Sequence, residues 1–187
     1  ETGASIEKYV SAKGIQALFG TYSNISMEQL EYEKIYLNEI LQRAIDGEKY
    51  AIKTWEDVIF NLSQLLFERI LTIHSGWQES FTITHSTQKI FKNNHQYRGT
   101  LLERIVIGQR LGELFASPAA EEFLLQPLCN KLGELILNSA SLPMNAKEHY
   151  LYSQQFNLNL LKISRLREAP ILGAGIDAYF SWRESCQ

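Results

Sequence analysis

Cysteine, proline and long apolar runs are all scarce in this chain of 187 residues. Two cysteines, Cys129 and Cys186, cannot build the disulfide framework of a small secreted scaffold. The apolar runs end within a handful of residues, far short of the roughly 20 that a membrane-spanning helix needs, so no membrane span is predicted. Neither sign of charge dominates, since 18 basic residues stand against 21 acidic ones, which excludes a dedicated DNA-coating protein.

The rest of the composition predicts one soluble globular domain. Apolar residues make up 45% of the chain and charged residues 21%, and a chain of this size buries roughly 70% of the surface that its unfolded form exposes. We therefore expect residues 5–187 to form a single helical domain. Residues 1–4 are expected to be a remnant of processing or of an added leader, because Glu1-Thr2-Gly3 resembles the scar of a secretory leader.

Apolar residues recur with the 3.6-residue period of a helix along most of the chain. The sequence therefore predicts an all-α fold, a bundle of about five to seven helices. The segment from Thr54 to Ser75 is apolar on most sides and is the candidate for the central helix. Residues 80–98 predict a short irregular or β-like excursion, because they are rich in β-branched and aromatic side chains. The other helices are expected at about residues 6–19, 26–46, 100–117, 118–138, 145–167 and 175–184.

Capping residues and prolines set several of these boundaries. Gly20 is expected to end the first helix, and Ser26 with Gln29 forms a capping box that opens the second. Pro127 lies inside the pattern over 118–138. It should kink or split that helix, because proline lacks an N–H donor and clashes with the preceding turn.

The residue patterns that support catalysis or cofactor binding are mostly missing from the sequence. The four histidines lack the spacing of helical metal sites, so no metal site is expected. Gly173-Ala174-Gly175 does not continue into a dinucleotide-binding turn, and no phosphate-binding glycine–lysine loop or Gly-x-Ser-x-Gly elbow occurs. We therefore expect no cofactor, and the protein is more simply explained as a non-enzyme.

One pattern on the expected central helix does point to catalysis. Arg69 and His74 are separated by four residues, which resembles the Arg-x(4–6)-His signature of HEPN ribonucleases. The resemblance covers six residues and implies an all-helical ribonuclease that works without metal, in which His74 transfers protons and Arg69 holds the scissile phosphate. The sequence departs from the family pattern at Ile70. The alternative is a helix-end histidine that interacts with the helix dipole, beside a surface arginine.

Two other segments predict recognition surfaces. Tyr32 and Tyr36, one turn apart on an acidic helix, suit a protein interface because tyrosine buries area at low entropic cost. Residues 85–110 carry five basic residues against one acidic residue, so they are expected to attract an anionic ligand or RNA. The bases proposed for this contact are Lys89, Lys92 and Arg98. The alternative is a solvated face whose bases pair with the acidic first part of the chain.

Gly108 and Gly112 form a further local feature. In a helix that begins near Thr100, both lie on an apolar stripe, and each costs roughly 1 kcal/mol relative to alanine. Close packing within the monomer, the seam of a homodimer, or a groove for a small molecule or cofactor would each offset that cost.

The leading functional hypothesis is a non-enzymatic recognition module that binds a protein partner. A metal-independent ribonuclease that uses Arg69 and His74 is the first alternative, and a small-molecule or cofactor binder at Gly108 and Gly112 is the second. The first three residues favour a secreted or extracellular protein, and a cytoplasmic one is expected otherwise. Both cysteines are expected to be free, with Cys129 buried.

Overall fold

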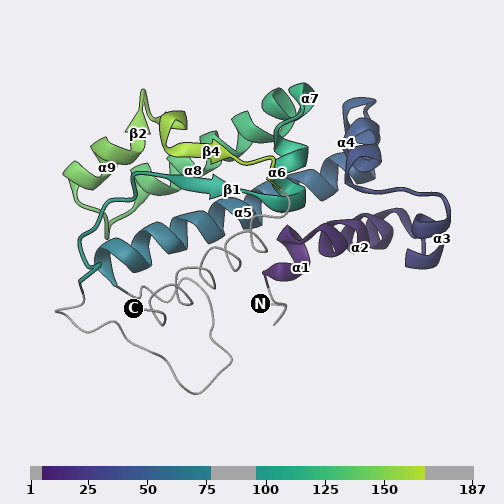
Figure 1. Ribbon diagram of the computed structural model, residues 1–187, viewed down its shortest axis with the longest axis horizontal. Helices are drawn as coiled ribbons and strands as arrows, with labels where there is room; N and C mark the ends of the chain where they lie inside the picture. Colours follow the sequence, from purple (N-terminus) through teal and green to yellow (C-terminus); the bar gives the residue numbers. More distant parts are fainter. Residues whose placement is uncertain (1–5, 77–95, 167–187) are drawn as a thin grey trace, which may run out of the picture.

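The computed structural model describes residues 6–76 and 96–166, and 67% of these residues are helical (Figure 1). This confirms the all-α bundle, which also contains a few short strands. Most of the excursion expected at residues 80–98 and the whole helix expected at 175–184 lie outside the described residues. Within the described stretches, no helix is both long and apolar enough to cross a membrane.

Helix α5, Lys49–Ser75, runs through the centre of the fold (Figure 1). Helices from both described stretches pack against it, which confirms the expected central helix. It begins earlier than expected, and Thr54 lies inside it. The Thr54 hydroxyl donates to the Tyr50 carbonyl at 2.7 Å, because a threonine within a helix can bond to the carbonyl one turn back instead of serving as a cap.

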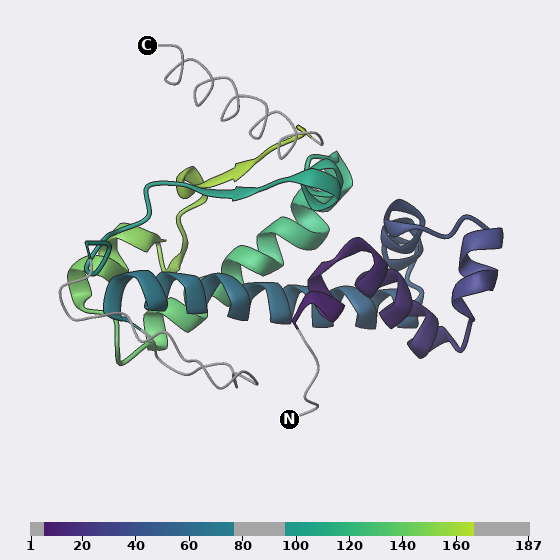
Figure 2. The ribbon, with the colours of Figure 1, turned by 60° about the horizontal axis from the view of Figure 1, so that its bottom comes forward.

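Four short helices precede α5, and three of them pack against it (Figure 2). These helices are α1 (Glu7–Val10), α2 (Ala12–Ser23), α3 (Met27–Tyr32) and α4 (Leu37–Ile45); α3 is the one that packs on α2 instead. The expected helix end at Gly20 is wrong, because α2 continues to Ser23 and Asn24 closes it with a φ of 57°. A glycine is required at position 20 for a different reason. A Cβ there would lie 2.7 Å from the carbonyl oxygen of Ile25.

The second expected helix is also wrong as a single element, because the chain breaks between α3 and α4. Ser26 opens α3 as predicted, and its hydroxyl accepts the Gln29 N–H at 3.2 Å. Lys34 then takes a positive φ of 56°. The buried side chain of Gln16 donates to the Ile35 carbonyl at 2.8 Å, so a contact with α2, distant in sequence, holds the break.

The second described stretch begins with a strand rather than the helix expected over 100–117. Its first elements are β1 (Ile105–Ile107), α6 (Gln109–Phe115), α7 (Pro118–Ala120), the π-helix η1 (Glu121–Leu125) and α8 (Gln126–Asn138). The helix over 100–117 is wrong because backbone pairing with a strand far along the chain replaces the local helical pattern at β1. The helix expected over 118–138 forms as a continuous helical stretch, and the turn directly before Gln126-Pro127 is π-helical.

The helix expected over 145–167 is wrong after its first two turns. The elements that follow α8 are α9 (Met144–Tyr150), β2 (Leu151–Tyr152), β3 (Gln155–Phe156), the 3-10 helix η2 (Leu158–Leu160) and β4 (Leu161–Ile163). Strands β2 and β3 are antiparallel, and Ser153 and Gln154 turn between them with φ of 50° and 68°. The hairpin packs directly on α8, where a Cβ at Gly133 would lie 2.8 Å from the Phe156 nitrogen.

Strands β1 and β4 pair in parallel, with Ile105 opposite Leu161. The segment that leads into β1 is held at Leu102. The Tyr150 hydroxyl accepts the Leu102 N–H at 2.7 Å, and His149 Nε2 lies 3.0 Å from the Leu102 carbonyl oxygen. Burial raises the pKa of Tyr150. Buried apolar side chains form one core around α5, and partly buried ones from α1 and β2 pack against it.

Candidate binding cleft

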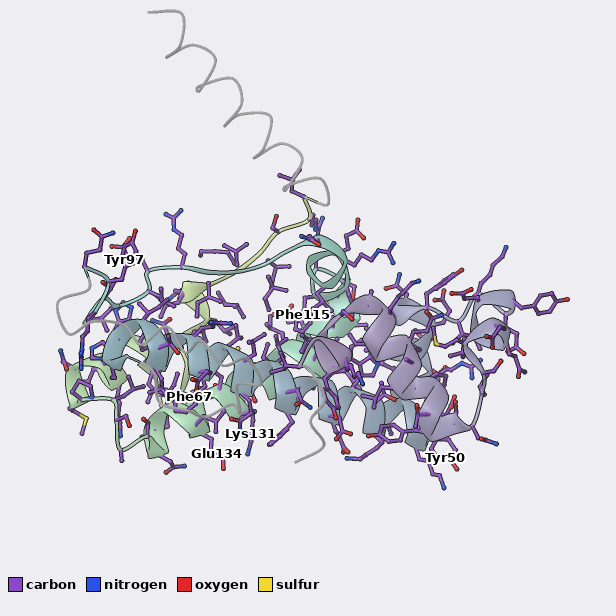
Figure 3. The ribbon with its side chains drawn as sticks, turned by 90° about the horizontal axis from the view of Figure 1, so that it is seen from below. Tyr50, Phe67, Tyr97, Phe115, Lys131 and Glu134 are labelled. Atoms are coloured by element: carbon purple, nitrogen blue, oxygen red, sulfur yellow. The ribbon has the colours of Figure 1, made fainter. Side chains whose placement is uncertain are left out.

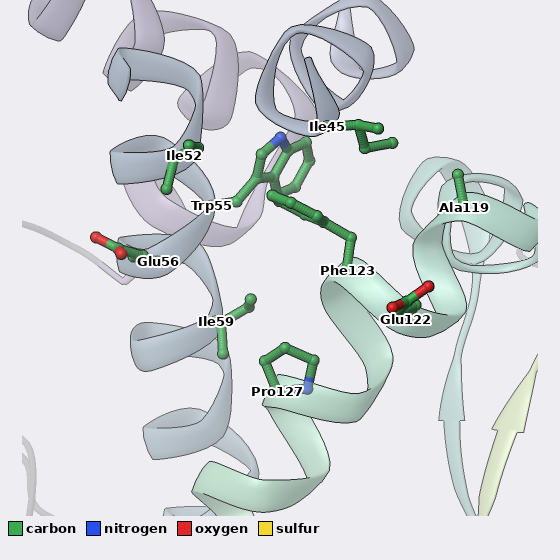
Figure 4. Close-up of a pocket in the computed structure, with 9 residues that line it drawn as sticks. All are labelled: Ile45, Ile52, Trp55, Glu56, Ile59, Ala119, Glu122, Phe123 and Pro127. Carbon is green, nitrogen blue, oxygen red and sulfur yellow. The ribbon is translucent and has the colours of Figure 1, made fainter. Parts of the chain in front are cut away.

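A cleft of about 570 Å³ lies between the first half of α5 and the helical rod formed by α7, η1 and α8 (Figure 4). Its lining is mainly apolar, and the end of α4 contributes one residue. The lining residues are Ile45, Ile52, Trp55, Glu56, Ile59, Ala119, Glu122, Phe123 and Pro127.

One wall of the cleft comes from the helical repeat of α5. Ile52, Trp55 and Ile59 are spaced by three and four residues, which places them on one face of the helix. Trp55 is only 1% exposed, so most of its ring belongs to the core. Its Nε1 atom is buried and has no hydrogen-bond partner. Buried donors without a partner are uncommon in native proteins, and each costs about 1–3 kcal/mol.

The opposite wall comes from the rod that Pro127 interrupts. Proline cannot donate the backbone hydrogen bond that an α-helix needs at this position, and the turn before it is the π-helix η1. Figure 4 shows α8 close to α5 below Pro127 and the two helices diverging above it. Phe123 projects from η1 into the space between them. The cleft therefore lies where the rod diverges from α5.

The cleft is bordered by negative charge. Glu56 and Glu122 are both exposed, lie at opposite sides in Figure 4 and form no ion pair with any described residue. The two segments that build the walls, residues 45–59 and 116–127, contain six acidic residues against two lysines. One of those lysines, Lys53, is paired with Asp57 at 2.6 Å. The surroundings of the cleft are therefore more acidic than the chain as a whole.

Arg69 and His74 both lie on the second half of α5, away from the cleft-lining residues. Arg69 is exposed, whereas His74 is half-buried and its Nδ1 lies 3.2 Å from the Ser75 hydroxyl. Five positions on an α-helix separate two side chains by about 140° around the axis. The two residues therefore point toward different sides of α5.

Tyr32 and Tyr36 are exposed, but the expected spacing of one turn on a common helix is wrong. Tyr32 is the last residue of α3 and is 88% exposed, while Tyr36 precedes α4 and is 49% exposed. Neither lines the cleft.

The basic segment is only partly described. Lys89 and Lys92 lie outside the described residues, and Arg98 is an exposed residue of the turn over 96–99. Its neighbour Tyr97 and Tyr50, at the start of α5, lie at opposite ends of the molecule (Figure 3). Arg98 is therefore far from the acidic end that contains the cleft.

Gly108 and Gly112 do not share a helix that begins near Thr100. Gly108 is the N-cap of α6, and Gly112 is buried inside α6. A Cβ at Gly112 would lie 2.1 Å from the carbonyl oxygen of Ser164, whereas one at Gly108 would meet only the Ser164 Cβ at 3.9 Å. Packing of α6 on the end of β4 accounts for the glycine at position 112.

The expected burial of Cys129 is confirmed. It is a free cysteine on α8, 1% exposed, and burial raises its pKa to about 11. Cys186 lies outside the described residues.

Four of the cleft residues, Trp55, Glu56, Glu122 and Phe123, are not among the site residues predicted from the sequence. If the helix began at Thr54, Trp55 would lie in its first turn. There, no preceding apolar residues would mark it as part of a helix face. The available signal was Pro127, because a proline inside a helical pattern predicts a bend and therefore a gap beside the bent helix.

Comparison of the chain with protein-family models, with curated proteins and with solved structures gives no match.

Proposed function

We propose that the protein is a non-enzymatic recognition module that binds a protein partner, and that the cleft between Trp55 and Phe123 receives a bulky apolar side chain of that partner. The observation that carries this proposal is an apolar cleft with two aromatic residues in its lining. Its volume lies within the roughly 300–1,000 Å³ of typical binding sites. Buried aromatic residues at the centre of an interface commonly dominate the binding energy.

A macromolecular partner explains the surface around the cleft better than a small molecule does. Ile45, at the edge of the cleft, is 41% exposed, and Phe60, one turn beyond Glu56 on α5, is 50% exposed. These exposed apolar side chains extend the contact area beyond the cleft itself. The lining contains no cysteine, histidine, serine or lysine, and its two carboxylates, Glu56 and Glu122, are exposed at opposite sides of the cleft. This arrangement favours binding over catalysis.

Site-specific photo-crosslinking tests the proposal in cells that produce the protein. A benzophenone side chain replaces Ile45 at the edge of the cleft or, as a control, Met144 on α9, which is 68% exposed. We expect the probe at position 45 to crosslink to a discrete protein and the probe at 144 to leave it unlabelled. Adding Phe123→Ala should reduce the crosslink at least tenfold, as removal of an interface aromatic commonly does.

The matched control for Phe123→Ala on η1 is Leu137→Ala on α8, because Leu137 is 43% exposed and does not line the cleft. Circular dichroism checks that both variants remain folded. Equal crosslinking from positions 45 and 144, a crosslink that survives Phe123→Ala, or crosslinks to nucleic acid alone would refute the proposal.

A further inference from the structure

We infer that the partner segment entering the cleft carries a basic residue, lysine or arginine, on each side of its bulky apolar anchor. The inference rests on the proposed function and adds the chemistry of the partner. It follows from where the charged side chains lie relative to the apolar lining.

The two carboxylates that border the cleft come from different walls. Glu56 projects from α5 and Glu122 from η1, and Figure 4 shows them at opposite sides of the apolar residues. An apolar side chain that enters between Ile59 and Phe123 therefore has a carboxylate on either side of it. On a partner helix, residues three or four positions before and after the anchor lie on the same face and would approach these two walls.

Neither carboxylate has an ion-pair partner within the described part of the chain, and Lys53 attracts Glu56 at longer range. Glu56 and Glu122 are exposed and form no ion pair there. Asp46 and Glu121, also exposed, add negative charge near the same walls. Lys53, the lysine nearest Glu56 along α5, already pairs with Asp57.

An acidic partner segment would be repelled by every one of these groups, and a neutral segment would leave Glu56 and Glu122 without an ion-pair partner. A segment with bases on both sides of its anchor complements them. Exposed ion pairs are individually weak, so the apolar anchor supplies most of the affinity. The charges instead select the partner and speed its association at low salt.

A displayed peptide library tests the inference with the full-length protein. Each member is a 16-residue amphipathic helix with tryptophan or phenylalanine at its centre, and the positions three and four residues to either side are randomised among lysine, arginine, glutamate, glutamine and alanine. Peptides are selected on the wild-type chain. Those whose binding falls at least tenfold on Phe123→Ala are scored as cleft binders.

We expect the cleft binders to be enriched in lysine or arginine on both sides of the anchor. Their affinity should fall about two- to thirty-fold in the double variant Glu56→Gln with Glu122→Gln, the sum of two exposed ion pairs. The matched control, Glu31→Gln with Glu148→Gln, removes the same charge from exposed positions on α3 and α9 and should leave the affinity unchanged. Raising the salt from 50 to 500 mM should remove most of the difference between wild type and the double variant.

The possible failures separate the two proposals. Cleft binders with neutral, acidic or one-sided basic flanks, or binding unchanged in the double variant, would overturn the inference and leave the proposed function standing. A library that yields no cleft binders, together with an absence of crosslinks from position 45, would overturn both. Self-association of the chain that is lost on Phe123→Ala would identify a second copy as the occupant and also overturn the inference.

Discussion

The two glycines at either end of the first turn of α6 provide a direct test of how this part of the fold packs. The perturbation is alanine at Gly112, compared with alanine at Gly108. At position 112 the new Cβ would lie 2.1 Å from the Ser164 carbonyl oxygen and 3.0 Å from the Ile107 carbonyl oxygen. Both obstacles are backbone atoms at the ends of β4 and β1, which cannot rotate away as a side chain would.

The expected magnitude follows from three contributions. Forcing the extra methyl group into a packed site costs about 1–3 kcal/mol. Displacing Ser164 also weakens the hydrogen bond from its N–H to the Ile107 carbonyl, 2.8 Å in the native fold, worth about 0.5–1.5 kcal/mol. The higher helix propensity of alanine stabilises the variant by roughly 1 kcal/mol, which offsets part of this loss. The net loss for Gly112→Ala is therefore about 0.5–3.5 kcal/mol, or roughly 1–14 °C in Tm for a chain of this length.

Gly108→Ala is the matched control, because the residue lies in the same turn and receives the same methyl group. Its φ of −129° suits any residue, and the nearest atom to the new Cβ is the Ser164 Cβ at 3.9 Å, an ordinary contact. We expect its stability to stay within about 0.5 kcal/mol of the wild type, because the site can accept alanine without strain.

Urea denaturation followed by circular dichroism measures both variants, and the m-value shows whether the unfolding transition remains comparable. If position 112 belonged to an open groove or to a regular helix through Thr100, alanine there would be neutral or stabilising. A Gly112→Ala variant as stable as the wild type, or equal losses at 108 and 112, would therefore refute the packing of α6 on β4.

Three further predictions concern other parts of the molecule. The Tyr22 hydroxyl donates a hydrogen bond to the Asp57 carboxylate, and this bond, with a smaller effect of burial, raises the pKa of Tyr22 from 10.0 to about 12. The protonated hydroxyl therefore stabilises the fold fully below pH 10, and this stabilisation is lost as the pH rises through 12. Tyr22→Phe should remove one late-titrating tyrosine from the absorbance titration and lower the stability at pH 8 by about 1 kcal/mol; an unchanged titration would contradict this. In a Cys186→Ser background, Cys129 should react with thiol reagents only on unfolding, since burial raises its pKa to about 11, and rapid labelling of the native protein would show that it is accessible. Gly133→Ala should destabilise the fold by about 1–3 kcal/mol, because the hairpin backbone lies 2.8 Å from the new Cβ; a gain in stability would mean that the hairpin does not pack there.

The sequence by itself determined the features that depend on residues close together in the chain. Three features follow from local chemistry. The helical class and the amphipathic face of α5 follow from side-chain periodicity, the cap at Ser26 from a hydroxyl next to free N–H groups, and the irregular turn before Pro127 from a missing donor. These signals lie within about one or two helical turns, so a single sequence displays them completely.

Only the tertiary structure decided where the chain leaves the helical pattern. Residues 145–167 carry a helical stripe, yet the chain turns into a hairpin at Ser153 and pairs β4 with β1. The β1–β4 pairing and the contact of the hairpin with Gly133 both join residues far apart in the sequence. The cleft arises in the same way. Trp55 and Phe123 lie on separate helices, and the divergence of these helices leaves an apolar space between them. Such contacts leave no local pattern, so periodicity and capping could not predict them.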